Sequence, residues 1–354
     1  MRAYAIILLF PLYAVMTIVP TVSIIVLNWN GKQYLETCLS SLLRQKYPDI
    51  EIIFVDNGSI DGSVEFVREK FPSLTVIIHK KNLGFAQGVN SGIMASHGKY
   101  IATINNDAEA DNEWISCLMH VMQSDPGIGS CASKMLRYYD REIIDSAGIV
   151  VYQNGNAYDR GAQEFDAGQY DMQTEIFGAC AGAALYRRLM LDEIGPFDDN
   201  YFAYFEDVDL SFRMHLFGWK CIFVPDAIVY HIHSATSQQA SPFKIFYIER
   251  NKLWNMWKYY PLSMMITQFP FTNIHYFRYI TKFLNKLIVR KSIKENRDPI
   301  FNYSFISIIS AVFRAKISAY GKLHYMIMQR KKLISKGADM SAIGPWIIKG
   351  YKRE

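Results

Sequence analysis

A regular alternation of apolar strands and amphipathic helices in the N-terminal third of the chain constrains the fold most. Residues 22–27 read VSIIVL, a continuous apolar run rich in β-branched side chains, as is typical of a strand buried on both faces. The segment after it carries leucines at helical spacing. The same pattern repeats and predicts strands over 22–27, 51–55, 74–78 and 100–104, and helices over 32–45, 61–70 and 84–96. Such repetition predicts an α/β fold with a Rossmann-like, mostly parallel sheet flanked by helices.

Clusters of Asn, Asp and Gly follow the predicted strands where each one stops. They read NWNG, DNGSIDGS, NLGFA and NND, at residues 28–31, 56–63, 82–86 and 105–107. A single cluster would be an ordinary turn, because these residues form turns and cap helices. In a parallel sheet, however, ligands bind beyond the carboxyl ends of the strands. Four clusters at that edge therefore predict a binding site for a polar ligand.

The net charge of +5 combines two parts of opposite sign. Residues 1–249 hold 18 Lys and Arg against 29 Asp and Glu, whereas residues 250–354 hold 20 against 4. In the C-terminal part the basic residues alternate with apolar and aromatic stretches, such as 262–277 and 303–313. This mixture favours helices that lie on an anionic membrane surface over a nucleic-acid partner. The alternative is a helical cap with a solvated basic face.

The N-terminal segment 3–19 is almost wholly apolar, with Arg2 before it and Pro11 within it. It is short for a membrane span, and no typical signal-peptide cleavage site follows. We expect that Met16 is the physiological start; the competing interpretation is a genuine membrane-dipping leader. Five cysteines without CxxC spacing argue against a zinc site or a disulfide framework and favour a reducing compartment.

Five motifs, in this order, resemble those of family 2 glycosyltransferases with the GT-A fold: VSIIVLNWNG, IIFVDNGSIDGS, NLGFAQGVN, INND and FEDVDL. The resemblance covers residues 22–260, and the NLGFA and NND forms are most similar to rhamnosyltransferase-type members. It implies transfer of a sugar, with rhamnose as one candidate, from a nucleotide-diphosphate donor to a glycan or a lipid-linked acceptor, with inversion at the anomeric carbon. Processive synthases that resemble this family carry a Gln-x-x-Arg-Trp sequence, which is absent here. We therefore expect a non-processive enzyme.

In the family, a D-x-D motif after the fourth strand holds Mg²⁺ or Mn²⁺, which neutralises the diphosphate leaving group. Here the motif is reduced to NND, so the resemblance implies Asp107 as its single carboxylate ligand. It also implies a histidine near the diphosphate or its metal. His231, predicted to follow a strand over 222–225, matches that position. The alternatives are that Asp107 caps the next segment and that His231 and His233 form a structural pair.

The resemblance assigns the donor site to the polar clusters. It places Asp56 against the nucleotide base, where a carboxylate accepts the imino N–H of uracil or thymine, so we expect a dTDP- or UDP-linked sugar. The alternative is an aspartate that only forms a turn. A glycine at the start of a helix allows a phosphate or a sugar to approach the backbone. The other donor-binding residues that the resemblance implies are Asn28, Asn30, Asn82, Gly84, Phe85, Asn106 and Arg250.

Inverting transfer needs a base that deprotonates the acceptor hydroxyl as it attacks. The family places this base in an acidic pair at the start of a helix, here within FEDVDL. The resemblance implies Asp207 as the base, with Glu206 as the reserve candidate. Acidic residues also stabilise the first turn of a helix, so capping is the alternative.

These patterns predict an apolar leader over 1–20, a glycosyltransferase domain over 21–260 and a basic helical region that associates with membranes over 261–354. The enzyme would then act at the cytoplasmic face of the cell membrane, peripherally or weakly anchored, in the synthesis of a cell-surface polysaccharide. A sugar-phosphate nucleotidyltransferase is a second interpretation, but the chain lacks a Gly-rich loop with Arg or Lys after the first strand. A non-catalytic sugar-binding remnant is a third. The presence of Asp56, Asp107 and Asp207 argues against it.

Overall fold

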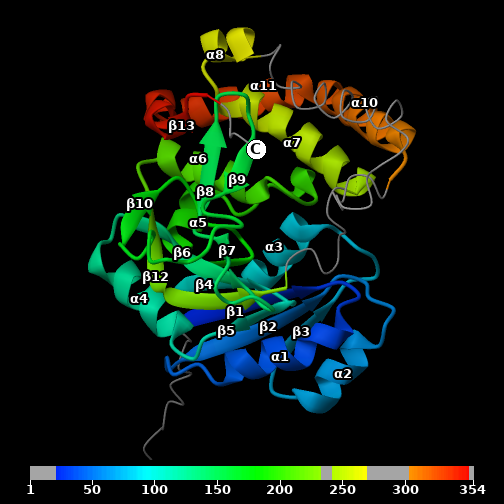
Figure 1. The fold of residues 1–354 in the computed structure, drawn as a ribbon, viewed down its shortest axis with the longest axis vertical. Helices are drawn as coiled ribbons and strands as arrows, with labels where there is room; N and C mark the ends of the chain where they lie inside the picture. Colours follow the sequence, from blue (N-terminus) through cyan, green and yellow to red (C-terminus); the bar gives the residue numbers. More distant parts are fainter. Residues whose placement is uncertain (1–20, 233–240, 269–302, 351–354) are drawn as a thin grey trace, which may run out of the picture.

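The computed structural model of the chain describes residues 21–232, 241–268 and 303–350. Its N-terminal half confirms the predicted alternation of strands and helices (Figure 1). These elements are β1 (Val22–Asn28), α1 (Lys32–Leu43), β2 (Ile50–Asp56), α2 (Ser63–Lys70), β3 (Thr75–Ile78), α3 (Phe85–Ala95) and β4 (Tyr100–Asn105). The predicted leader over residues 1–20 lies outside the described residues.

Among these elements, the largest shift at a start concerns α2, which begins at Ser63 and not at Asp61. The Asp61 carboxylate accepts a hydrogen bond from the Ser63 amide (3.1 Å) and another from the Lys32 amide (2.9 Å). Aspartate often forms such a bond with the backbone two residues further on, which stabilises a turn in place of a helix.

The second half of the sheet domain adds shorter elements: β5 (Ala108–Ala110), α4 (Trp114–Ser124), β6 (Ile128–Arg137), β7 (Ile144–Ser146), β8 (Ile149–Tyr152), β9 (Ala157–Asp159), β10 (Thr174–Ile176), β11 (Ala183–Arg187), α5 (Arg188–Ile194), the 3₁₀ turn η1 (Asp199–Tyr201), α6 (Glu206–Leu216) and β12 (Lys220–His231). The large sheet has the strand order β10-β12-β6-β11-β4-β1-β2-β3. Its first four strands in the sequence pair in parallel, as do β6 and β12, whereas β11 runs antiparallel between β4 and β6. The predicted mostly parallel sheet is therefore confirmed.

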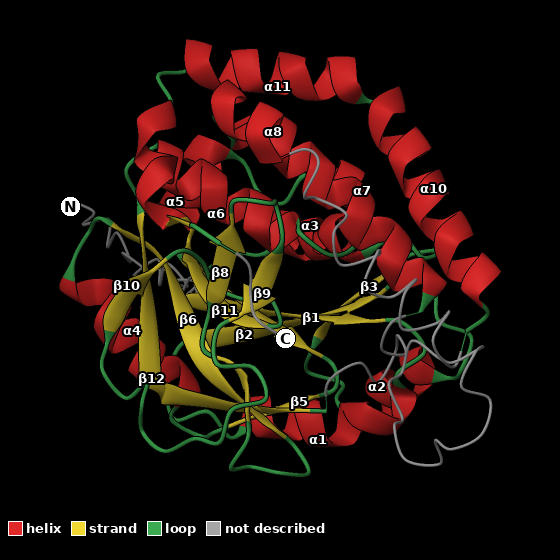
Figure 2. Ribbon diagram, turned by 45° about the horizontal axis from the view of Figure 1, so that its top comes forward, coloured by secondary structure: helices red, strands yellow, loops and turns green. Residues whose placement is uncertain are grey.

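Helices cover both faces of this sheet (Figure 2). Neighbouring side chains of a strand point to opposite faces. Ile24 of β1 accordingly joins the apolar core under α1 and α4, and Ile25 joins the core under α3, α5 and α6. The strand needs apolar residues at every position because both of its faces are buried.

β12 is much longer than the strand predicted over 222–225. Its register with β6 shifts between Val224 and Ile228, so a bulge accommodates the proline at which the predicted strand ended. The strand then continues to His231, which lies opposite Ala108 of β5. The prediction that His231 follows this strand is therefore wrong, because His231 lies within it.

The C-terminal part is helical and consists of α7 (Pro242–Tyr259), α8 (Leu262–Gln268), α10 (Phe305–Gly321), α11 (Leu323–Ser335), the 3₁₀ segment η4 (Met340–Trp346) and the short strand β13 (Ile347–Ile348). α10 and α11 pack against α7, and β13 pairs with β8. Trp254 of α7 shares a buried core with Phe212 of α6. Figure 1 shows this helical layer at the end of the molecule opposite α1 and α2.

Two predicted amphipathic stretches fall in this part. The stretch over 262–277 begins with α8, and its residues from 269 onward lie outside the described ones; the stretch over 303–313 becomes the first half of α10. Within the described ranges, no helix combines the length and the apolar character needed to cross a bilayer.

Candidate active site

A cavity of about 780 Å³ lies at the carboxyl ends of β1, β4 and β12. The starts of α6 and α7 and the segment before β11 complete its walls. Eight of the predicted site residues line it: Asn82, Gly84, Phe85, Asn106, Asp107, Glu206, Asp207 and His231. One cavity thus brings together the predicted metal ligands, the predicted base and part of the predicted donor site.

Asp107 and His231 are neighbours on one wall of this cavity. Asp107 Oδ1 lies 3.2 Å from His231 Nε2, and Asp145 Oδ2 lies 2.7 Å from His231 Nδ1. Burial lowers the pKa of His231, but the two carboxylates outweigh burial and raise this pKa to about 10. The imidazolium therefore bridges two carboxylates at neutral pH, and both ring nitrogens donate.

The opposite wall begins with an unusual loop that leads into α6. Phe202, Tyr204 and Phe205 all have positive φ angles (66°, 65° and 69°), which bulky residues rarely adopt. The amide of Asn251 on α7 holds this loop by donating to the carbonyl oxygens of residues 201, 203 and 204. Arg250, a predicted donor-binding residue, donates to the carbonyls of residues 200 and 201 and is not among the residues that line the cavity.

This loop presents the acidic pair at the start of α6. Asp207 accepts a hydrogen bond from the Ala181 amide (3.3 Å), and its partial burial in the cavity wall raises its pKa to about 6. Glu206 is 6% exposed, and its Oε2 atom has no hydrogen-bond partner in the part of the chain that the structure describes. Burial, and after it the neighbouring Asp207 charge, raise the pKa of Glu206 well above its usual range. Asp207 is therefore mostly ionised at neutral pH, and Glu206 keeps its proton to a higher pH than an ordinary glutamate does.

The predicted residues at the ends of β1 and β2 lie behind the cavity wall. Asp56 is 1% exposed and accepts hydrogen bonds from Asn28 Nδ2 (3.3 Å) and from the amides of Gly58 and Ser59 (3.2 and 2.9 Å). Asn28 in turn accepts a bond from Asn106 Nδ2 (2.6 Å), and Asn106 reaches the cavity. Asn28, Asp56 and Asn106 therefore form one buried network with a single member at the surface of the cavity.

A second polar group surrounds the start of α3. Asn57 donates to Asn82 Oδ1 (3.1 Å) and to the carbonyl of Gly84 (3.0 Å), and all three residues line the cavity. Gly84 has φ +86°, and a Cβ there would lie 2.4 Å from the Phe202 carbonyl oxygen. Glycine is thus required where α3 meets the loop before α6. Asn30, by contrast, accepts a bond from the Ile60 amide (2.9 Å) and is absent from the cavity wall.

Residues 23–195 match the family model of glycosyl transferase family 2. The chain carries a family 2 glycosyltransferase domain. This match confirms the predicted family and the prediction of a glycosyltransferase, and it ends before α6, so it does not extend to the acidic pair.

Two relatives of this glycosyltransferase domain carry names of the same kind. An N-acetylglucosaminyl-diphospho-decaprenol L-rhamnosyltransferase of Mycobacterium tuberculosis is 25% identical over 241 residues, which cover 62% of this chain and 78% of that protein. EpsH of Bacillus subtilis, named as a glycosyltransferase, is 26% identical over 241 residues, which cover 64% of this chain and 65% of EpsH. The alignment therefore leaves more than a third of EpsH unmatched.

Solved structures confirm the predicted GT-A fold. GalNAc-T7 with UDP, GalNAc and Mn²⁺ gives a TM-score of 0.57 at 16% identity and covers 70% of this chain and 49% of its own. The mannosyltransferase PcManGT from Pyrobaculum calidifontis, with GDP-Man and Mn²⁺, gives 0.51 at 16% identity and covers 93% of this chain and 88% of its own. At these identities the likeness concerns the fold alone.

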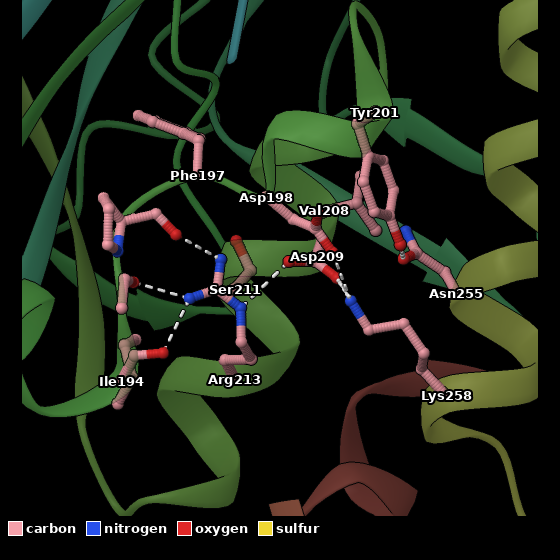
Figure 3. Close-up of polar contacts among 12 residues, drawn as sticks. Ile194, Phe197, Asp198, Tyr201, Val208, Asp209, Ser211, Arg213, Asn255 and Lys258 are labelled. Carbon is pink, nitrogen blue, oxygen red and sulfur yellow. Dashed lines mark hydrogen bonds and ion pairs between the residues drawn. The ribbon is translucent and has the colours of Figure 1, made fainter. Parts of the chain in front are cut away.

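A buried ion network anchors α6 from the side opposite to the cavity (Figure 3). Asp209 accepts hydrogen bonds from Arg213 Nε (2.9 Å), from the Tyr259 hydroxyl (2.6 Å) and from the Lys258 ammonium. Burial alone would raise the pKa of Asp209, but Lys258 and Arg213 outweigh burial and hold this pKa at about 2. Arg213 also donates to the carbonyls of residues 194, 195 and 196. Asp209 therefore fixes α6 in the fold and takes no part in the cavity.

The donor set on the cavity wall suits a divalent cation that has further ligands from elsewhere. Among the described residues, no group of three or more His, Cys, Asp or Glu side chains is arranged for a metal. Asp107 can supply one ligand, and His231 can supply a second once its Nε2 atom has lost its proton; the bond from Nδ1 to Asp145 is the carboxylate support that metal-binding histidines usually have. The diphosphate of a donor would have to complete the coordination.

Several residues that line the cavity have no signal in the sequence. Asp145 and Asp159 lie on short strands outside any motif, and Lys244 and Tyr303 come from the C-terminal part. Among the cavity residues that were not predicted, Trp29, Asn57 and Asn105 belong to the polar clusters, where their position after a strand could have identified them. The others reach the cavity through tertiary contacts between segments far apart in the sequence.

Proposed function

We propose that this chain is an inverting, non-processive glycosyltransferase that moves one sugar from a nucleotide-diphosphate donor to a glycan or a polyprenyl-linked acceptor. One observation carries the proposal: Asp107 and Asp207, from separate parts of the sequence, line the same cavity of a family 2 glycosyltransferase domain. A carboxylate suited to the diphosphate side and another suited to the acceptor side are what this reaction requires.

Asp207 acts as the base in this proposal. A pKa of about 6 leaves it ionised at neutral pH and more basic than an ordinary aspartate. The acceptor hydroxyl attacks the anomeric carbon from the face opposite to the diphosphate and forms the new C–O bond while the bond to the diphosphate breaks. Its proton passes to Asp207, whose orientation the Ala181 amide sustains.

The diphosphate leaves from the side of Asp107. Mg²⁺ or Mn²⁺, held there by Asp107 and His231, would neutralise the charge that develops on the leaving group. The bond from His231 Nδ1 to Asp145 holds the ring in place.

The donor in this proposal is a dTDP- or UDP-linked sugar, with rhamnose as one candidate. Asp56, buried behind the cavity wall, would act on the base through its network with Asn28 and Asn106, of which Asn106 reaches the cavity. The mycobacterial relative, named as a rhamnosyltransferase with a decaprenol-linked substrate, supports both the sugar and the lipid-linked acceptor. Asn28, Asn30, Asn82, Gly84, Phe85 and Arg250 would contribute to this site directly or by supporting it.

A lipid-linked acceptor would place the enzyme at the cytoplasmic face of the cell membrane. The C-terminal part, with 20 basic against 4 acidic residues from position 250, supports peripheral attachment to an anionic surface. The acidic N-terminal part would then lie on the side of the aqueous phase, from which the soluble donor binds.

A panel of nucleotide sugars, tested with the full chain and Mn²⁺, checks this function. We expect dTDP-rhamnose or a UDP-sugar to raise the melting temperature, since a ligand that binds only the folded state stabilises it by mass action. Slow hydrolysis of the same donor should release a nucleoside diphosphate. Production of a nucleoside triphosphate from donor and pyrophosphate would indicate a nucleotidyltransferase instead. Binding without any turnover, in the presence of candidate acceptors, would indicate a sugar-binding protein.

A further inference from the structure

Most large apolar side chains of α10 are exposed, whereas the buried side of the helix carries mainly alanines. This is the reverse of the usual amphipathic pattern. Its buried positions are mainly alanines, together with one isoleucine: Ile308, Ala311, Ala315 and Ala319. Its outward positions are large, apolar and exposed by 38% to 79%: Ile306, Ile309, Phe313, Ile317 and Tyr320. They recur at helical spacing and form one stripe along the helix. A helix that is apolar on both sides normally has something covering each of them.

α11 continues this surface. Ile327, Lys331 and Ile334 follow each other at helical spacing, and the two isoleucines are 40% and 50% exposed. Both helices pack against α7, so their outward sides point away from it (Figures 1 and 2). We call the outward side chains of α10 and α11 the C-terminal face.

The charge around the C-terminal face has one sign. Residues 303–350 contain eight Lys and Arg and a single acidic residue, Asp339. Arg314, Lys331, Lys332 and Lys336 are exposed on or next to these two helices. Apolar side chains flanked by lysines are typical of helices that lie in the interface of an anionic bilayer.

The C-terminal face begins at the rim of the cavity. Tyr303 lines the cavity and packs in one cluster with Ile308 and Ala311 of α10. Phe243 of α7, 46% exposed, lines the same cavity. Ile306, the first residue of the stripe, follows Tyr303 by about one helical turn.

We propose that the C-terminal face docks on an anionic lipid bilayer and that the cavity beside it takes its acceptor from that bilayer. The second half of this statement rests on the proposed function, whereas the first does not. A second copy of the chain is a poorer occupant, because two faces with the same strong positive charge repel each other. Anionic headgroups neutralise the lysines while the acyl region covers the isoleucines and the phenylalanine.

Co-sedimentation with vesicles tests the docking surface. The probe is the full chain mixed with equimolar phosphatidylglycerol and phosphatidylcholine, or with phosphatidylcholine alone. We expect binding to the anionic vesicles that high salt weakens. The double variant Phe313→Asp with Ile317→Asp should lower the partition coefficient about tenfold, because two charged groups would have to enter the interface. Lys331→Glu with Lys332→Glu should remove most of the preference for anionic vesicles.

Met94→Asp is the control, because Met94 is a large apolar residue on α3, outside the C-terminal face, and at 80% is at least as exposed as Phe313 and Ile317 (64% and 58%). We expect it to bind vesicles like the unaltered chain. Equal loss in Met94→Asp, or equal binding by the Phe313 and Ile317 double variant, would overturn the proposal. So would sedimentation velocity showing a dimer that only the double variant dissociates, since the face would then bind a second copy.

Acceptor assays separate this inference from the proposed function. With a short-chain, water-soluble acceptor, the double variant should transfer sugar at the same rate as the unaltered chain. With a long-chain polyprenyl acceptor in vesicles, its rate should fall about tenfold, in step with binding. Equal rates in vesicles would overturn delivery from the bilayer. Absence of transfer in every variant and with every acceptor would count against the proposed function and leave the vesicle-binding result standing.

Discussion

The carboxylates on the two sides of α6 have pKa values that are shifted in opposite directions. On the cavity side, Asp207 and Glu206 lie together and form no ion pair with another described residue, and both pKa values are raised. On the buried side, Asp209 contacts Lys258 and Arg213, and its pKa is lowered to about 2. The two aspartates are only two residues apart, so the difference comes from tertiary partners and not from the helix.

This contrast separates the part of α6 that does chemistry from the part that holds it in place. An aspartate with a raised pKa opposes folding at neutral pH, because the folded state disfavours its charge. An aspartate with a lowered pKa supports folding there. Anchoring by Asp209 therefore offsets the cost of keeping Asp207 ready to accept a proton.

Asp207→Asn should have the largest effect on activity. The amide cannot accept the acceptor proton, so we expect turnover to fall about 10³-fold. Donor affinity should stay within about threefold, because the side chain keeps its size and lies on the acceptor side. Steady-state transfer and donor titration measure the two quantities. Turnover within about tenfold of the unaltered enzyme would show that Asp207 is not the base.

Asp209→Asn should have the largest effect on stability. It leaves Lys258 and Arg213 buried without their carboxylate, and breaking a buried ion pair in this way costs about 3 kcal/mol of unfolding free energy. Urea denaturation measures it. The matched comparison is the double variant with Lys258→Met, which removes the stranded ammonium and should recover part of the loss. A loss below about 1 kcal/mol in Asp209→Asn would mean that the network does not anchor α6.

The sequence predicts the first half of the fold well because its signals are local. Runs of β-branched residues mark β1 and β2, and the turn residues after them mark the edge of the sheet where the cavity lies. The errors at element ends are local too: Asp61 forms a turn where a helix start is predicted, and a bulge carries β12 past its proline.

The site is less predictable because its charges come from distant segments. Asp145 pairs with His231 across 86 positions, and Lys258 reaches Asp209 across 49. Neither pairing leaves a spacing in the sequence. The sequence therefore identifies an acidic turn in FEDVDL but cannot show which of its carboxylates is paired and which faces the cavity.

The contributions of Asp207 and Asp209 to the free energy of unfolding should depend on pH with opposite signs. Asp207, whose pKa is raised to about 6, contributes stability in its protonated form, and this contribution is lost as the pH rises from about 4 through 6. Asp209 contributes above about pH 4, and its contribution is lost as the pH falls through about 2. At neutral pH, Asp207→Asn should therefore be more stable than the unaltered chain, by about 2 kcal/mol.

Urea denaturation of both proteins at about pH 4.5 and pH 7.5 checks this sign, and the two curves should approach each other at the lower pH. The pH profile of the activity should reflect the same group. We expect kcat/KM to rise with pH through about 6 and then level off, because the base has lost its proton there. An Asp207→Asn variant that is less stable at both pH values would contradict the assignment of a strained, ionised base.

Glu206→Gln should have the smallest effect, and it tests whether the two members of the acidic pair differ. If burial keeps Glu206 neutral, its role is that of an O–H group beside the substrate, which a glutamine amide can replace as a hydrogen-bond donor. We expect turnover within about threefold of the unaltered enzyme and an unchanged rise of kcat/KM near pH 6. Glu206→Leu, which has no donor, should lose more, mainly as a higher KM for the acceptor. A loss in Glu206→Gln as large as that in Asp207→Asn would instead make Glu206 an essential carboxylate. The cavity side of α6 would then work as a coupled pair, and the distinction between its two carboxylates would fail.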